Sequence, residues 1–256
     1  MTSAKDLLIL LTNDDGARAL GIIALKEELS ALGEVVVVAP SEERSAVSHG
    51  LTIHHPIRVI ELSGNHYALT GNPADCVIFA VRKLLRRMPD IVVSGINHGP
   101  NLGDDVLYSG TVAGAREAAL YGIPSMAVSL AALQASPDFK PAAGFVRQLI
   151  REFYPERFLA GTFLNVNVPE GEIKEYRFTR QGTKVADSAI EEKHDPRGRK
   201  YYWIGRDESE WVIEADTDYH AIQDKVVSIT PLHHDQTDYR SLKEYTEKQE
   251  RMHIVE

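Results

Sequence analysis

The stretch that decides the fold is Leu7-Leu8-Ile9-Leu10-Leu11-Thr12-Asn13-Asp14-Asp15-Gly16, where five apolar residues run directly into a polar turn. A short, wholly apolar run of this kind is typical of a strand buried on both faces of a parallel sheet. Gly21–Leu32 follows with apolar residues at helical spacing, and Val35–Ala39 repeats the apolar run. This alternation predicts an α/β domain with helices on both faces of its sheet.

The same alternation continues to about residue 163 and then changes. Further helices are expected at Ala74–Arg87, Val112–Tyr121 and Pro141–Phe153, and further strands at Ile91–Ser94, Ser125–Leu130 and Asn165–Val168. Later segments alternate polar and apolar residues, as in Glu175–Thr179 and Tyr201–Gly205, around the turn Asp195–Gly198. We therefore expect one domain over residues 1–256, with a core over 1–165 and a β-hairpin-rich extension over 166–256. That extension would end in a charged helix, Ser241–Met252.

The composition excludes several classes of protein. The chain has 256 residues and a formal net charge of −9, which disfavours binding to a nucleic-acid polymer because phosphate contacts need surplus Lys and Arg. No segment approaches the roughly 20 apolar residues of a membrane span, so no membrane partner is expected. Cys76 is the single cysteine and lies in an apolar run, which favours a core residue over a catalytic thiol. These features predict a cytoplasmic protein.

Polar side chains follow three of the apolar runs. Asp14 and Asp15 follow the first, Ser45 follows the second together with Arg44, and Asn97 follows the third together with His98. The carboxyl ends of parallel strands meet at one edge of a sheet, where ligands bind. Two adjacent carboxylates are costly without a cation, and oxygen donors without clustered Cys or His favour Mg²⁺, Mn²⁺ or Ca²⁺ over structural zinc. The alternative is that Asp14 and Asp15 only form a turn that caps the next helix.

A second feature suits an anion. Ser109, Gly110 and Thr111 precede an Ala-rich helix, so the free N–H groups at its start could bind a phosphate. The alternative is that Ser109 or Thr111 is an ordinary N-cap. Four other groups are interpreted as structural or solvated: Asp104-Asp105, His54-His55, His233-His234 and, unless it contacts the substrate, Arg44.

Several motifs occur in the order seen in one known family. They are Thr12–Gly16, Ala39-Pro40 with Glu43–Ala46, Gly71–Val77, Ser94–Asn97 with Gly99 and Asn101, Tyr108–Val112, Asp195–Gly198 and Ser228–Leu232. With these motifs the chain resembles the SurE (survival protein E) family of nucleotidases and acid phosphatases over nearly its whole length. Two positions depart from the family pattern: Ala46–Gly50, where many relatives carry a Gly and a His-Ser pair, and Asn72, where Thr is common.

The resemblance implies a Rossmann-like, three-layer domain and hydrolysis of 5′- or 3′-nucleoside monophosphates. It also implies one divalent metal ion per subunit, held by Asp14, Asp15, Ser45 and Asn97. The family forms dimers or tetramers that exchange C-terminal segments. The aromatic hairpin carrying Tyr201, Tyr202, Trp203 and Trp211 would then be the exchanged arm, whereas packing on its own chain is the alternative from the residues alone.

The expected reaction is metal-assisted hydrolysis of a phosphomonoester. Asp14 and Asp15 would hold the metal, and one of them would help position or deprotonate water. The phosphate oxygens would contact Asn101, Ser109, Gly110 and Thr111. His98 could contact the phosphate or the leaving group. An aspartyl-phosphate phosphatase would need a second Asp where Gly16 stands, and a nicotinamide-dependent dehydrogenase would need a G-x-G-x-x-G motif after the first strand. A nucleotide-binding sensor without catalysis is the alternative from another class, and an assay of phosphate release with and without EDTA separates the two.

Overall fold

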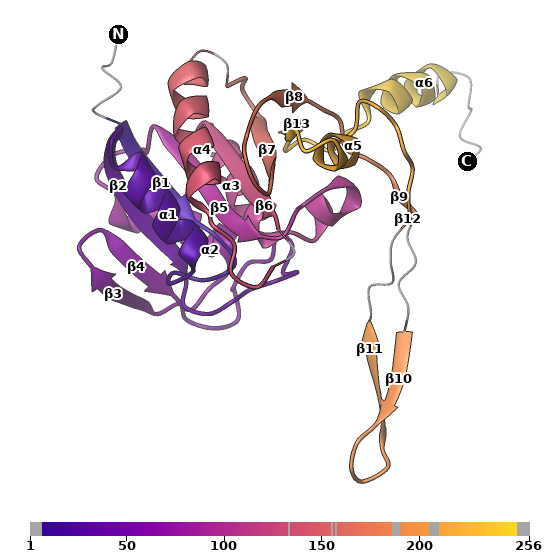
Figure 1. The fold of residues 1–256 in the computed structure, drawn as a ribbon, viewed down its shortest axis with the longest axis horizontal. Coiled ribbons are helices and arrows are strands. Elements are labelled where there is room, and N and C mark those ends of the chain that lie inside the picture. Colours follow the sequence, from indigo (N-terminus) through magenta and orange to yellow (C-terminus); the bar gives the residue numbers. More distant parts are fainter. Residues whose placement is uncertain are drawn as a thin grey trace, which may run out of the picture.

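The largest sheet of the chain is mostly parallel. The computed structural model describes residues 7–132, 134–154, 156, 158–185, 190–204 and 210–249. Within them, one sheet has nine strands in the order β3-β4-β2-β1-β5-β6-β7-β13-β8 (Figure 1). These strands are β1 Leu7–Thr12, β2 Gly33–Pro40, β3 Val59–Ser63, β4 His66–Leu69, β5 Ile91–His98, β6 Ser125–Ala131, β7 Thr162–Pro169, β8 Tyr176–Phe178 and β13 Val227–His233. Strand β1 lies between β2 and β5 and is parallel to both, so its carboxyl end faces the centre of one sheet edge.

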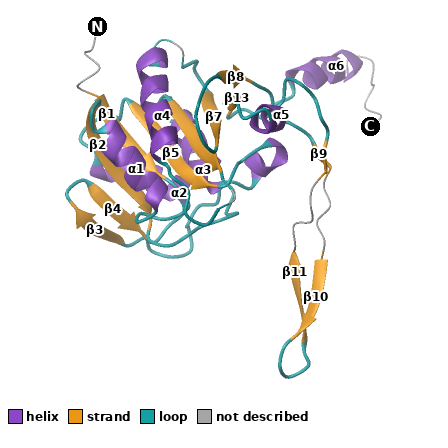
Figure 2. Cartoon of the chain, viewed as in Figure 1, coloured by secondary structure: helices purple, strands orange, loops and turns teal. Residues whose placement is uncertain are grey.

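Alternate residues of β1 face two different helix layers. Ile9 and Leu11 belong to a core that includes α1 and α4, whereas Leu8 and Leu10 belong to a core that includes α2 and the end of α3. The helices are α1 Leu20–Leu29, α2 Pro73–Phe79, α3 Gly110–Leu120, α4 Lys140–Phe153, α5 Asp218–Gln223 and α6 Tyr239–Gln249, with a π-helical turn at Ala80–Leu84 and a 3-10 turn at Gly103–Leu107 (Figure 2). The predicted three-layer α/β architecture is confirmed.

The first half of the chain differs from the sequence prediction at three places. The helix expected over Ala74–Arg87 starts at Pro73, becomes π-helical at Ala80 and ends at Leu84. The hairpin β3–β4 was not predicted. Strand β5 continues to His98, and its register against β6 shifts between Ser94 and Asn97, so Asn97 belongs to a strand and not to the loop after it.

The second half of the chain returns to the main sheet. Strand β13 pairs antiparallel with β7, and β8 pairs with β13, so the segment after residue 165 extends the core sheet. The predicted strand Glu175–Thr179 corresponds to β8. The predicted C-terminal helix corresponds to α6, which begins at Tyr239, and its expected last residues 250–252 lie outside the described residues. No helix in the described part of the chain has both the length and the apolar character to cross a membrane.

The remaining strands form a long arm. β10 (Ile190–His194) and β11 (Lys200–Ile204) pair antiparallel, and β9 (Lys184–Val185) and β12 (Glu210–Trp211) pair at the base of the arm. Figure 1 shows the β10–β11 hairpin standing away from the main sheet. Tyr202 and Trp203 are 58% and 59% exposed, whereas Trp211 stacks on Tyr219 at 4.4 Å. Trp211 therefore packs on its own chain, whereas Tyr201, Tyr202 and Trp203 of β11 are exposed. Gly205, the predicted end of this strand, lies outside the described residues.

Gly21 lets the start of α1 approach β5. A Cβ atom added at Gly21 would lie 2.0 Å from the carbonyl oxygen of Ile96, which is backbone and cannot rotate away. We expect Gly21→Ala to lower the free energy of unfolding by about 2 kcal/mol through overpacking. The control is Gly144→Ala in α4, where the nearest atom would be 3.9 Å away. That variant should gain up to about 1 kcal/mol from the better helix propensity of Ala. Urea unfolding of both variants tests this, and equal stabilities would contradict the close approach.

Candidate active site

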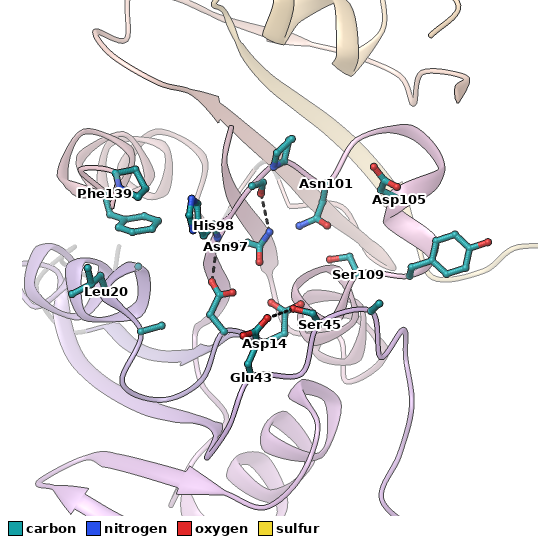
Figure 3. Close-up of a pocket in the computed structure, with 18 of the residues that line it drawn as sticks. Asp14, Leu20, Glu43, Ser45, Asn97, His98, Asn101, Asp105, Ser109 and Phe139 are labelled. Atoms are coloured by element: carbon teal, nitrogen blue, oxygen red, sulfur yellow. Dashed lines mark hydrogen bonds between the residues drawn. The ribbon is translucent and has the colours of Figure 1, made fainter. Parts of the chain in front are cut away.

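The carboxyl ends of β1, β2 and β5 meet at one cavity. It has a volume of about 520 Å³ and includes among its lining residues Asp14, Asp15, Glu43, Ser45, Asn97, His98, Asn101, Asp105, Tyr108 and Ser109. In Figure 3, Asp14, Glu43 and Ser45 lie together at one side of this cavity, with Asn97, His98 and Asn101 above them and Ser109 next to Ser45. The structure thus brings together the four residues expected to hold a metal: Asp14, Asp15, Ser45 and Asn97.

Asp14 is buried and held by the start of α3. Its side chain is 5% exposed and accepts a hydrogen bond from the hydroxyl of Thr111. Burial raises the pKa of the Asp14 carboxyl, while the Thr111 hydroxyl and the backbone N–H groups of Thr111 and Gly110 act in the opposite direction. A Cβ atom at Gly110 would lie 2.9 Å from Asp14 Oδ2, so the contact requires glycine there. The N-terminus of α3 therefore supports this carboxylate.

Two of the three residues predicted to bind phosphate at the start of α3 do not line the cavity. Gly110 and Thr111 lie against Asp14 and are not part of the cavity lining. Ser109 lines the cavity, and its hydroxyl also accepts a hydrogen bond from Val112 N at 3.1 Å, as an N-cap does. Ser109 therefore caps α3, as the alternative interpretation expected, and it also borders the cavity, where phosphate binding stays a prediction.

Asp15 lies in a strongly negative environment. Its carboxyl has a pKa raised to about 6, first by burial and then by the charges of Asp14 and Glu43, with the backbone N–H of His98 as the main opposing influence. That N–H donates to Asp15 Oδ2 at 3.2 Å. A divalent cation beside these carboxylates would remove the repulsion, so the electrostatics of the site fit a bound metal.

Ser45 and Asn97 present neutral oxygen donors to the same space. The Ser45 hydroxyl donates to Glu43 Oε1 at 2.6 Å, which leaves the lone pairs of its oxygen for a cation. The amide nitrogen of Asn97 donates to Gly99 O at 2.8 Å, which turns its amide oxygen away from that bond. Within the described residues no group of three or more His, Cys, Asp or Glu side chains is arranged to hold a metal. A cation here would therefore depend on the hydroxyl and amide oxygens as well as the carboxylates, and such a set suits Mg²⁺ or Mn²⁺.

Asn101 is fixed by a buried polar network. Its backbone N–H donates to Asn167 Oδ1 and its side chain donates to Ser129 Oγ, both at 2.8 Å. The side chains of Asn165 and Asn167 donate to its carbonyl oxygen at 2.8 and 3.0 Å. These bonds hold Asn101 at the cavity wall. No role was predicted for Asn165 and Asn167, although polar residues that alternate along an otherwise apolar strand are a signal of such a network.

The remaining predicted residues lie around this centre. His98 is exposed at the cavity, where its ring contacts Phe139 edge-on at 6.4 Å and Nε2 is 2.9 Å from Gln134 O. Arg44 donates its backbone N–H to Asp14 O at 2.7 Å but does not line the cavity. Asp105 lines the cavity and pairs with Lys184 at 3.2 Å. Cys76 is buried, and burial raises the pKa of its thiol, as expected of a core residue.

One carboxylate at the cavity was also missed from the sequence. Glu43 lines the cavity, accepts the Ser45 hydroxyl and contributes to the raised pKa of Asp15. It stands in the expected strand-end loop and in the motif Glu43–Ala46, but no role in the site was predicted for it. The available signal was a further carboxylate two residues before the Ser45 hydroxyl.

Comparison with known proteins places the chain in a family. The family model described as "Survival protein SurE" matches residues 9–188. The chain belongs to the SurE family. A protein named "5′-nucleotidase SurE" from Pelobacter propionicus is 52% identical over 241 residues, covering 93% of this chain and 98% of the relative. Another of the same name from Geobacter sulfurreducens is 50% identical, covering 91% and 90%. The crystal structure of a SurE protein from Aquifex aeolicus matches with a TM-score of 0.84 at 41% identity, covering 94% of this chain and 99% of that one.

Proposed function

We propose that the chain is a metal-dependent phosphomonoesterase that hydrolyses 5′-nucleoside monophosphates, and 3′-nucleoside monophosphates as well. The observation that carries this proposal is the oxygen-donor set of Asp14, Asp15, Ser45 and Asn97 at one cavity. The SurE relatives named 5′-nucleotidases, which align over more than 90% of the chain, support the substrate class. We propose one Mg²⁺ or Mn²⁺ ion per subunit.

The residues of the cavity divide the chemical work. Asp14, Asp15, Ser45 and Asn97 would hold the cation, which supplies Lewis-acid polarisation of a phosphate oxygen and a more acidic water. Asp14 or Asp15 would position that water or accept its proton. Asn101 and Ser109 lie on the side of the cavity away from Leu20 and Phe139 and would donate hydrogen bonds to phosphate oxygens as negative charge develops there. The buried network behind Asn101 would keep that donor in place without reorganisation.

An apolar side of the cavity would receive the nucleoside. Leu20 and Phe139 lie together on one side of the cavity in Figure 3, away from Asn101 and Ser109. Leu20 is 62% exposed although it is a large apolar residue at the start of α1. A nucleobase has flat apolar faces, which suit such a wall, while the phosphate stays at the oxygen-rich side.

The test compares nucleotides with a phosphomonoester that has no base. We expect Leu20→Ala to raise KM for AMP and related nucleotides about tenfold, because the base loses a few methyl contacts. KM for glycerol phosphate, which has no base, should not change. Leu107→Ala is the matched control, since Leu107 is 50% exposed but does not line the cavity. A wild-type protein that binds nucleotides but releases no phosphate from them would favour the sensor alternative.

We also propose that the enzyme is a cytoplasmic homodimer or homotetramer in which the arm and the C-terminal segment are exchanged. The exposed side chains of Tyr201, Tyr202 and Trp203 in β11 support an intersubunit role for the arm. Tyr239, Leu242 and Tyr245 of α6 are likewise at least 50% exposed, and they recur every three residues along one helix. Burial of these side chains against a second subunit would stabilise the dimer or tetramer.

A further inference from the structure

The loop that carries Ser45 is held in a costly conformation. Ala46 and Ser48 have φ angles of 56° and 53°, in the left-handed region that side chains other than glycine avoid. The chain has no glycine between Ser45 and His49 that would adopt this conformation without cost. The conformation therefore persists only if contacts outside the loop over-determine it.

Two of those contacts come from Ser48. Its backbone N–H donates to Tyr108 O at 2.8 Å, and its hydroxyl donates to Leu107 O at 2.7 Å. Both acceptors immediately precede Ser109, which caps α3. The loop is thereby joined to the same helix start that holds Asp14.

The third contact joins His49 to Glu117. His49 Nε2 lies 2.7 Å from Glu117 Oε2, and Glu117 is only 7% exposed. Glu117 lies in α3, two helical turns after Gly110, whose N–H supports Asp14. Of the described residues, His49 alone is shown bonding to this carboxylate. A buried carboxylate needs a donor, so the ring nitrogen facing it carries a proton.

We propose that the His49–Glu117 pair positions Ser45 relative to Asp14 by clamping the Ser45 loop onto α3. Helix α3 then fixes the position of both groups: its first turn supports the Asp14 carboxylate, and its second half holds the loop that carries the Ser45 hydroxyl. Because the four proposed metal ligands are already in place, cation binding does not have to include the free-energy cost of ordering the loop. His49 and Glu117 touch neither cation nor substrate in this arrangement, so they are positioning residues. This inference rests on the proposed metal site.

The test measures Mn²⁺ binding directly, by isothermal titration calorimetry of the full chain without nucleotide. We expect His49→Ala to weaken Mn²⁺ binding about tenfold, within the range found for residues that orient metal ligands. His49→Gln should restore most of the affinity, because its amide nitrogen can reach the place of Nε2 and donate to Glu117. His55→Ala is the matched control, an exposed histidine nearby in the chain, and should bind Mn²⁺ as the wild type does.

A second measurement separates positioning from general stability. At saturating Mn²⁺ the kcat of His49→Ala should stay within about threefold of wild type, since the extra metal restores the occupied site. Wild-type Mn²⁺ affinity in His49→Ala, or a lowered melting temperature with unchanged affinity, would overturn the inference. If His49→Ala does not fold, Glu117→Ala, which removes the acceptor, is measured instead, with weakened Mn²⁺ binding expected and wild-type affinity again overturning the proposal. A wild-type protein that binds no Mn²⁺ would overturn the metal site itself.

Discussion

Replacing Asp14 with Asn is expected to lower kcat for nucleoside monophosphates by about 10³-fold, with the fold intact. The amide keeps the size of the carboxylate and can still accept a hydrogen bond from Thr111. It removes the negative charge at the point where the N-terminus of α3, the Ser45 loop and Asp15 converge. Loss of that charge weakens the cation site and removes one candidate proton acceptor together.

Steady-state phosphate release with AMP, alongside a circular dichroism spectrum, measures the effect. Thr111→Val is the informative companion variant, because it removes the hydroxyl behind Asp14 and leaves the carboxylate in place. We expect a loss of about tenfold for it, as for other residues that orient a metal ligand. Turnover of Asp14→Asn at the wild-type rate would remove Asp14 from the mechanism.

Replacing Asp15 with Asn is expected to stabilise the protein when no metal is present. The pKa of Asp15 is raised from 3.8 to about 6 in the folded state, mainly by burial and then by Asp14. The folded state therefore holds this proton more tightly than the unfolded chain does. Below about pH 4 the Asp15 carboxyl does not lower the free energy of unfolding. Its destabilising effect grows between about pH 4 and pH 6, and above that it lowers the free energy of unfolding by about 3 kcal/mol.

Thermal unfolding in EDTA checks the sign of this effect. At pH 8, Asp15→Asn should melt several degrees above the wild type, and the difference should shrink when both are measured at pH 5. Added Mn²⁺ should reverse the order, because the wild type gains binding energy that the variant lacks. A metal-free variant that melts below the wild type at pH 8 would show that the carboxylate is not under electrostatic strain.

The main elements of the site could be predicted because they follow from strand ends. Apolar runs located β1, β2 and β5, and parallel strands put Asp14, Ser45 and Asn97 at one edge. The support of Asp14 by Gly110 and Thr111 could not be predicted, since the sequence places the start of a helix but not the group that its N–H bonds face. Glu43 was missed for a related reason: whether an acidic loop residue faces solvent or a cavity is decided by tertiary packing.

The fold was predicted best where the apolar pattern was strong. The hairpin β3–β4 was missed because β3 is largely exposed and has no buried-strand pattern. Strand β13 was missed because Pro231 interrupts it, and proline is unusual inside a sheet. The structure accommodates it because β8 pairs only with Val227–Ile229, so Pro231 lies beyond that partner. The change from α2 to a π-helical turn at Ala80 leaves no mark in the pattern of apolar residues.

The central claim is that Asp14 and Asp15 form a metal-dependent phosphomonoesterase site, and one measurement tests it most directly. Phosphate release is followed over a panel of 5′- and 3′-nucleoside monophosphates in EDTA, and again after Mg²⁺ or Mn²⁺ is restored, with Asp14→Asn in parallel. We predict that EDTA abolishes wild-type turnover, that the metal restores it, and that the variant stays inactive in both conditions. Full wild-type activity in EDTA would contradict the account.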